Sequence, residues 1–204
     1  MSADAGTANL PSVLNSDRII WAEETEKKWW RNAHEKAPDP LEFSNAPGRF
    51  SDPTLPFKTL YLGTESVTCF WESGLGRKLA LRFPNDRTIT EEDLKARLEY
   101  TASLDSAGLR LFDSTHSAAR RSIGAQSSAC FQADHLRSRQ WAKALFCAKA
   151  HGILYASTRA DGTCLALFES DATRKAVRLL KQVRCSYDNA SLLASLFREQ
   201  VSLL

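Results

Sequence analysis

Two short apolar runs around an Asp-Gly pair constrain the fold of this chain more than any other feature. They form the stretch GILYASTRADGTCLALF, from Gly152 to Phe168, with Asp161-Gly162 as the turn signal. Asp-Gly between two such runs is typical of a β-hairpin. The first run ends in Ser157, Thr158 and Arg159, polar residues that a purely structural hairpin does not need. The sequence therefore predicts a hairpin and leaves open whether its polar end faces a ligand.

The rest of the chain predicts short strands interrupted by helices. Strands are expected over residues 58–64 (KTLYLGT), 78–83 (KLALRF) and 109–112 (LRLF). Helices are expected over residues 18–30, 65–73, 90–108, from Asp134 to the region of Gly152, and over 191–204, while 173–183 fits either state. Residues 37–57 are rich in Pro, Gly, Ser and Asp and predict a long loop, a kind of segment that tends to be functional. This mixture favours an α+β fold, and no glycine-rich dinucleotide or phosphate-loop motif is present.

Composition narrows the class of protein. With 204 residues, 43% of them hydrophobic, the chain fits one globular domain with extensions or at most two small domains. A net charge of +3 permits an anionic small molecule or an acidic partner, but it falls short of the basic footprint of a nucleic-acid-binding protein. Five scattered cysteines without a CxxC pair predict buried reduced thiols, and four histidines without HxH or HExxH spacing predict no metal site.

Targeting and membrane signals are not found in the sequence. The first 16 residues have neither the basic nor the apolar region of an export signal. No apolar run approaches the ~20 residues that a membrane span needs. We therefore expect synthesis in the cytosol and no membrane partner.

Two arginines stand where local structure does not require them. Arg31 follows the Trp29-Trp30 pair and, taken alone, fits an exposed arginine at a helix end. Arg49 lies beside Gly48 in the long loop. Its planar guanidinium could bind a phosphate or, equally well, pin the loop by bonding carbonyl groups.

Three further polar residues fall on the predicted strands and helices. Tyr61 lies on the strand over 58–64, and Glu72 follows the apolar stretch Cys69-Phe70-Trp71. A carboxylate beside apolar surface stabilises positive charge on a sugar ring more strongly than one in water, although a solvent-facing glutamate is the simpler interpretation. Ser157 has no histidine nearby in the sequence to act as its base, so a positioning role is favoured over covalent attack.

Taken in order, these places resemble the RES domain, a family named for its arginine, glutamate and serine. The stretches that carry the resemblance are WWR (29–31), GRF (48–50), LYLG (60–63), FWE (70–72), LRLFD (109–113) and the hairpin at 152–168. The pattern Gly-Ile-Leu-Tyr-x-Ser-x-Arg, followed by a second strand, is the most specific part. Phe50 stands where many relatives carry Trp, and the bulky residues before Glu72 imply a narrower pocket.

The resemblance implies an α+β fold with a compact, ADP-ribosyltransferase-like mixed β core surrounded by helices. It also implies a toxin of a bacterial toxin–antitoxin pair that destroys NAD+ by phosphorolysis or hydrolysis. NAD+ would be a substrate and no cofactor is expected, with inorganic phosphate the co-substrate of phosphorolysis. The expected partner is an antitoxin or immunity protein that covers the active site, and the expected location is the cytoplasm, of the producing cell or of a target cell.

The family's site residues carry over onto this chain one by one. Three are implied to be catalytic: Glu72, Arg49 and Ser157. Five are implied to bind NAD+: Arg31, Arg49, Tyr61, Ser157 and Arg159. Because nicotinamide is already a cationic leaving group, its departure leaves an oxocarbenium-like ribose. The arginines would then bind the pyrophosphate, the tyrosine would stack on nicotinamide, the glutamate would steady the cation, and the serine would position the ribose.

The resemblance also divides the chain. We expect an N-terminal extension over 1–27, mobile and then helical, an NAD-cleaving domain over 28–170, and a helical C-terminal extension over 171–204 packed on it. Two other functions stay open on this evidence. One is a protein mono-ADP-ribosyltransferase on the same fold, and the other is a nucleotide-binding module without catalysis.

Overall fold

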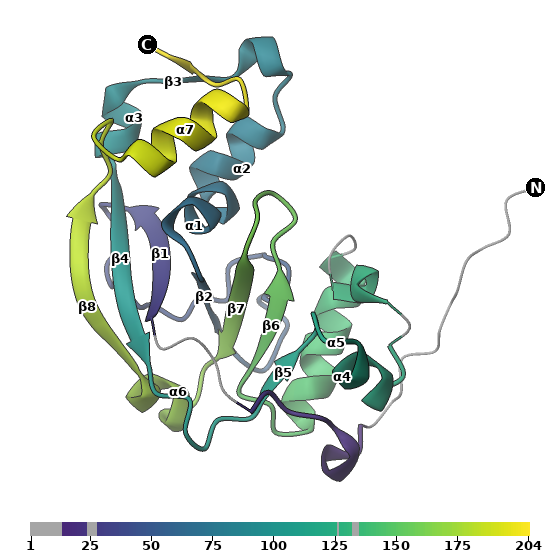
Figure 1. Ribbon diagram of the computed structural model, residues 1–204. Coiled ribbons are helices and arrows are strands. Elements are labelled where there is room, and N and C mark those ends of the chain that lie inside the picture. Colours follow the sequence, from purple (N-terminus) through teal and green to yellow (C-terminus); the bar gives the residue numbers. More distant parts are fainter. Residues whose placement is uncertain (1–13, 24–27, 126, 132–134) are drawn as a thin grey trace, which may run out of the picture.

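A seven-stranded mixed sheet forms the centre of the molecule (Figure 1). The computed structural model describes residues 14–23, 28–125, 127–131 and 135–204. In spatial order the strands are β5 (Leu111–Asp113), β6 (Gly152–Ala156), β7 (Thr163–Phe168), β2 (Thr59–Gly63), β1 (Lys28–His34), β4 (Arg97–Leu104) and β8 (Val177–Arg184). β5 and β6 are parallel, and the other neighbours are antiparallel. The expected α+β fold with a mixed β core and surrounding helices is confirmed.

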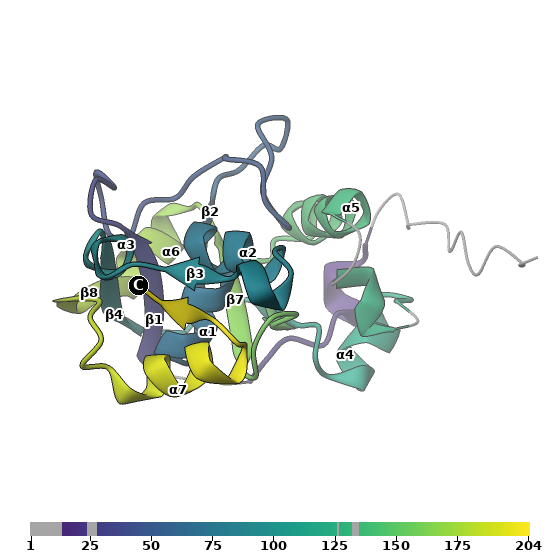
Figure 2. The ribbon, with the colours of Figure 1, turned by 90° about the horizontal axis from the view of Figure 1, so that it is seen from above.

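The helices gather at three places around the sheet. At one end lie α1 (Ser66–Glu72), α2 (Gly74–Ala80), α3 (Glu91–Lys95) and α7 (Ala190–Arg198), together with a small parallel sheet of β3 (Thr88–Ile89) and β9 (Ser202–Leu203) (Figures 1 and 2). Beside the β5 edge lie α4 (Ser117–Ser122) and α5 (His135–Cys147). α6 (Asp171–Ala176) leads into β8, and short 3-10 turns cover Ser16–Arg18, Pro84–Asp86 and Ser128–Phe131. Within the described residues no helix is long and apolar enough to cross a membrane.

The hairpin formed by β6 and β7 is buried on both faces. Ile153 and Tyr155 belong to one apolar cluster, whereas Leu154 belongs to another on the opposite face. This alternation has the period of two that a strand requires, and it explains why both runs are almost wholly apolar. At the turn, Gly162 has φ of +111°, a conformation that favours glycine. The predicted hairpin and its turn are confirmed.

The expected helix over 90–108 is wrong for most of its length. The predicted capping pair is present, since Thr90 and Asp93 form a reciprocal capping box, but the helix ends at Lys95. Residues Arg97–Leu104 are β4, which pairs with β1 on one side and β8 on the other. Pairing across two strand edges and burial of alternate side chains outweigh the helix propensity of this stretch.

Three other expectations about elements need correction. The helix expected over 18–30 is wrong: the described part contains a 3-10 turn and then β1, and residues 1–13 and 24–27 lie outside the described residues. No strand forms over 78–83, because residues 78–80 are the end of α2 and residues 81–83 belong to no helix or strand. The ambiguous stretch 173–183 is a helix to Ala176 and a strand from Val177, so the segment 171–204 adds a strand to the main sheet besides its helices.

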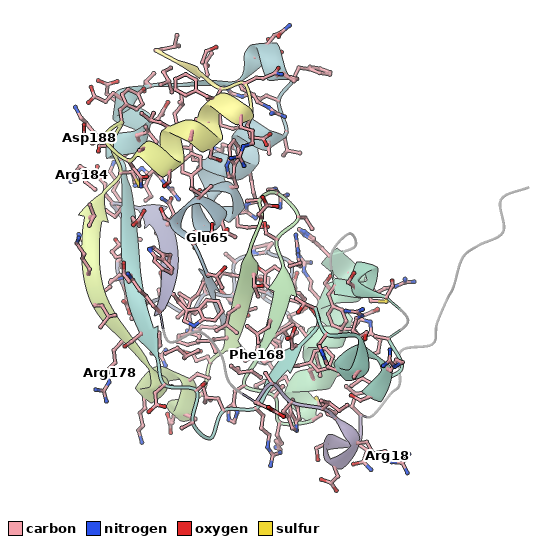
Figure 3. All side chains as sticks on the ribbon, in the orientation of Figure 1. Arg18, Glu65, Phe168, Arg178, Arg184 and Asp188 are labelled. Carbon is pink, nitrogen blue, oxygen red and sulfur yellow. The ribbon has the colours of Figure 1, made fainter. Side chains whose placement is uncertain are left out.

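The outer edge of the sheet is formed by β8, which is paired on one side by β4. Seven of its eight residues are exposed. Figure 3 shows Arg178 and Arg184 near opposite ends of this strand. Exposed leucines lie between these two arginines. Basic side chains on an edge strand discourage its pairing with another chain, so the arginines protect this apolar part of the edge.

The cysteines only partly match expectation. Cys69, Cys164 and Cys185 are buried free thiols, as predicted. Cys130 is half-buried and Cys147 is exposed, so the prediction of buried thiols is wrong for Cys147. Cys147 is the last residue of α5, where its side chain can face solvent.

Candidate active site

A cavity of about 250 Å³ opens where the long loop, β2, the α1–α2 corner and the hairpin meet. Among the described residues, its charged lining consists of four arginines and one glutamate: Arg31, Arg49, Arg77, Arg159 and Glu72. Tyr61 lines it as well, whereas Ser157 lies behind Glu72 and contacts its carboxylate. The structure thus brings together all six residues singled out in the sequence. The excess of cationic groups favours an anionic ligand.

The Glu72 carboxylate is held at both oxygens. Its Oε1 accepts a hydrogen bond from Ser157 Oγ at 2.7 Å and one from the Thr158 backbone nitrogen at 3.2 Å. Its Oε2 lies 3.3 Å from Arg159 Nη1 in an ion pair. Because three donors fix the group, it needs little reorganisation to act on a charge that develops nearby.

Helix α1 fixes the position of Glu72 from the other side. Cys69, Phe70 and Trp71 are buried, so the helix is anchored just before the glutamate. Trp71 Nε1 donates a hydrogen bond to Ser195 Oγ of α7 at 2.6 Å. The chain then turns directly into α2, where a Cβ on Gly76 would lie 2.2 Å from the Phe70 carbonyl oxygen. This close approach of α2 to α1 therefore requires glycine at position 76.

The Ser157 hydroxyl is the centre of the turn that presents the hairpin residues. Its oxygen accepts hydrogen bonds from the backbone nitrogens of Arg159 and Ala160, both at 3.1 Å. Its proton is directed at Glu72. With its acceptor sites used by the backbone and its proton given to a carboxylate, the hydroxyl has the geometry of a positioning group.

Arg49 is a buried cation without a carboxylate partner among the described residues. Only 7% of the residue's surface is exposed, and its Nη2 donates a hydrogen bond to Thr158 Oγ1 at 2.7 Å. The guanidinium carbon lies 5.1 Å from the centre of the Tyr155 ring. Nη1 is buried and has no hydrogen-bond partner within the described part of the chain. An unsatisfied charged donor is costly, so an anionic ligand would provide its missing partner.

Arg31 and Tyr61 are tied to the long loop. Arg31, on β1, donates from Nη1 to the Glu42 carbonyl oxygen at 3.0 Å, and burial lowers the pKa of its guanidinium. It is a strand residue, not the helix-end arginine that its local sequence indicated. The Tyr61 hydroxyl accepts a hydrogen bond from the Phe50 backbone nitrogen at 2.8 Å, and burial raises its pKa. Tyr61 therefore holds the loop that carries Arg49, a contact that sequence reasoning missed.

Three basic residues around the cavity were also missed. Arg77 of α2 and His135 at the start of α5 line the cavity, and Arg139 of α5 bonds to the loop through the Gly48 carbonyl oxygen at 2.9 Å and Asp52 at 2.7 Å. Burial lowers the pKa of His135, and the surrounding arginines lower it further. No local sequence signal marks these residues, because they reach the cavity only through tertiary packing.

Comparisons with known proteins bear on the family and on the fold. The family model described as the RES domain matches residues 28–188. Among solved structures, the chain is similar to one chain in a crystal structure of the M. tuberculosis MbcT–MbcA toxin–antitoxin complex, with a TM-score of 0.61 and 20% sequence identity. The similarity covers 83% of this chain and 88% of that chain. No curated protein matches. At this identity the structural match concerns the fold alone.

Proposed function

The chain belongs to the RES domain family, and from this we propose that it is a toxin enzyme that depletes NAD+ by cleaving the bond between nicotinamide and ribose. The observation that carries the proposal is the Glu72 carboxylate, fixed by Ser157 and Arg159 in a cavity otherwise rich in arginine. One immobilised anion among several cations suits a substrate with a cationic reacting centre and an anionic tail.

The reaction needs charge stabilisation more than acid catalysis. Nicotinamide leaves as a neutral molecule from a cationic ring, and the ribose carbon gains positive charge as the bond breaks. In the proposal, Glu72 stabilises this charge and accepts a hydrogen bond from a ribose hydroxyl. Ser157 keeps the carboxylate in place and positions the same ribose. Phosphate or water then attacks, which makes the enzyme a phosphorylase or a glycohydrolase.

The arginines bind the pyrophosphate in this proposal. Arg49 is the main contact, because its buried Nη1 has no hydrogen-bond partner among the described residues and a phosphate oxygen can supply one. Arg31 and Arg159 assist, and the ring of Tyr61 packs on nicotinamide. A cavity of about 250 Å³ is smaller than most ligand sites, so it suits one end of a dinucleotide, with the rest extending outward past the exposed Arg77.

The proposal includes a protein partner. The solved structure to which this chain is similar is a toxin–antitoxin complex. We expect a cognate antitoxin or immunity protein to cover the cavity and hold the enzyme inactive in the cytoplasm. An acidic contact surface would complement the four arginines that line the cavity.

One experiment tests the activity directly. The purified protein is incubated with NAD+, with and without inorganic phosphate, and the products are identified by phosphorus NMR. ADP-ribose 1″-phosphate formed only with phosphate identifies phosphorolysis, and ADP-ribose formed in both conditions identifies hydrolysis. Transfer of label from NAD+ to protein would instead identify an ADP-ribosyltransferase. Intact NAD+ in all conditions, with folded protein, contradicts the proposal and leaves a binding module.

A further inference from the structure

Thr158 contacts both of the groups on which the proposed function depends. Its hydroxyl oxygen accepts a hydrogen bond from Arg49 Nη2 at 2.7 Å. Its backbone nitrogen donates to Glu72 Oε1 at 3.2 Å. The residue is exposed and lies in the turn between β6 and β7. Its side chain therefore contacts the candidate site and does not contribute to the hydrophobic core.

The Thr158 hydroxyl controls the orientation of the Arg49 guanidinium. The ring of Tyr155 lies 5.1 Å from the guanidinium carbon, and a contact of this kind permits rotation of the group in its own plane. A hydrogen bond to one terminal nitrogen removes that freedom, because it is directional. The other terminal nitrogen, Nη1, is the one without a hydrogen-bond partner among the residues that the structure describes. The direction of Nη1 therefore depends on the bond that Thr158 makes to Nη2.

We propose that Thr158 is a positioning residue that aims Arg49 at an anionic group of the ligand and sets its distance from Glu72. The identification of that group as the pyrophosphate of NAD+ rests on the proposed function. In this proposal the Thr158 side chain acts on anion binding through Arg49, while its backbone N–H holds the Glu72 carboxylate in place. Arg159 shares the same hydroxyl through a longer contact of 3.4 Å from its Nη1, so two arginines converge on it.

The two contacts of Thr158 can be separated experimentally. Replacement by valine removes the hydroxyl and keeps both the branched shape and the backbone N–H. The variant Thr158→Val should therefore weaken binding of the anion while the carboxylate stays in place. Thr158→Ser restores the hydroxyl and should restore binding. Thr158→Ala repeats the test if the valine variant is unfolded.

A matched control is available at Thr115. This threonine is also exposed, and its hydroxyl also bonds to a side chain, Asp113 Oδ1 at 2.6 Å. Neither residue lines the cavity. Thr115→Val therefore removes a comparable hydrogen bond away from the site. Melting temperatures of all variants establish that they are folded.

The measurements are the affinity for ADP by calorimetry and the KM and kcat for NAD+. ADP carries the pyrophosphate without the reacting bond, so it reports binding independently of turnover. Loss of a hydrogen bond to a charged group should raise the Kd for ADP and the KM for NAD+ by about tenfold or more in Thr158→Val. The kcat should change by less than about threefold, because the bonds to Glu72 persist. Thr158→Ser and Thr115→Val should resemble the wild type.

Several results would overturn the inference. They are an unchanged Kd for ADP in Thr158→Val, a fall in kcat without a change in Kd, and a serine variant as weak as the valine variant. The proposed function fails separately. If the wild type leaves NAD+ intact but its ADP affinity depends on the Thr158 hydroxyl, the enzymatic proposal is wrong and the positioning role stands.

Discussion

The Ser157 hydroxyl lies 2.7 Å from Glu72 Oε1, although 85 positions in the sequence separate the two residues. The contact joins the turn of the hairpin to the last residue of α1. It makes the serine and the glutamate parts of one unit rather than two independent groups.

Glu72→Gln should abolish turnover of NAD+ while the fold persists. Glutamine keeps the shape of the side chain and an acceptor for Ser157, but it lacks the negative charge that stabilises the developing cation in the proposed reaction. The rate should fall by at least about 10²-fold, as for other losses of a single electrostatic contact. Turnover is measured by release of nicotinamide, and growth of cells that express the variant provides a second readout. A fully active and toxic variant contradicts the role of Glu72.

Arg49→Lys should weaken ligand binding although the positive charge is retained. Lysine cannot bond to Thr158 and present a second donor in the same plane, as the guanidinium does. We expect the KM for NAD+ to rise by about tenfold or more, by the loss of a charge-assisted hydrogen bond. Arg110→Lys, at an exposed position that does not line the cavity, is the control. Equal KM values for the two variants would show that Arg49 has no special role.

Ser195→Ala should destabilise the protein by about 1–3 kcal/mol, because it leaves the buried Trp71 Nε1 without its acceptor. The free energy of unfolding is obtained from urea denaturation. Ser191→Ala, at an exposed position of the same helix, is the matched control and should have a much smaller effect. If Ser195→Ala is no less stable than the control, α7 does not brace α1 through this bond.

Cys164 and Cys69 should resist alkylation in the folded protein, whereas Cys147 should react first. Burial, reinforced by the nearby Glu72 carboxylate, raises the pKa of Cys164 to about 12, and burial also raises the pKa of Cys69 well above its usual value. The reactive thiolate is therefore scarce at about pH 8. Cys147 is exposed at the end of α5. Peptide mapping after brief treatment with iodoacetamide gives the order of reaction. Modification of Cys164 as fast as Cys147 would contradict its burial.

Local sequence patterns correctly predicted the elements whose structure depends mainly on neighbouring residues. The hairpin followed from alternating burial and an Asp-Gly turn, and α5 followed from its amphipathic pattern. The strands β1 and β4 were missed because each is stabilised by its partner, with seven paired positions between Lys28–His34 and Arg97–Ser103. Such pairing leaves little trace in either sequence alone.

The candidate site was likewise predictable from the sequence only in part. The resemblance to a family located six residues, and all six meet at or beside the cavity. Their roles stay predictions. The contributions of Arg77, His135 and Arg139 could not be foreseen, because α2 and α5 bring them to the cavity from elements without a recognisable motif. The contact of Tyr61 with the loop backbone likewise depends on the folded loop.

The placement of β2 between β1 and β7 has a consequence for synthesis of the protein. A ribosome makes β2 and Glu72 long before it makes the hairpin that holds them, and α7 emerges later still. Strand pairings this distant in sequence form late in folding. A nascent chain that stops before Ser157 thus has its glutamate without its serine, and the site is completed only after the hairpin has been made. The proposed activity would therefore begin only after the hairpin has been made, and the proposed inhibitory partner would meet a chain in which the site is already assembled.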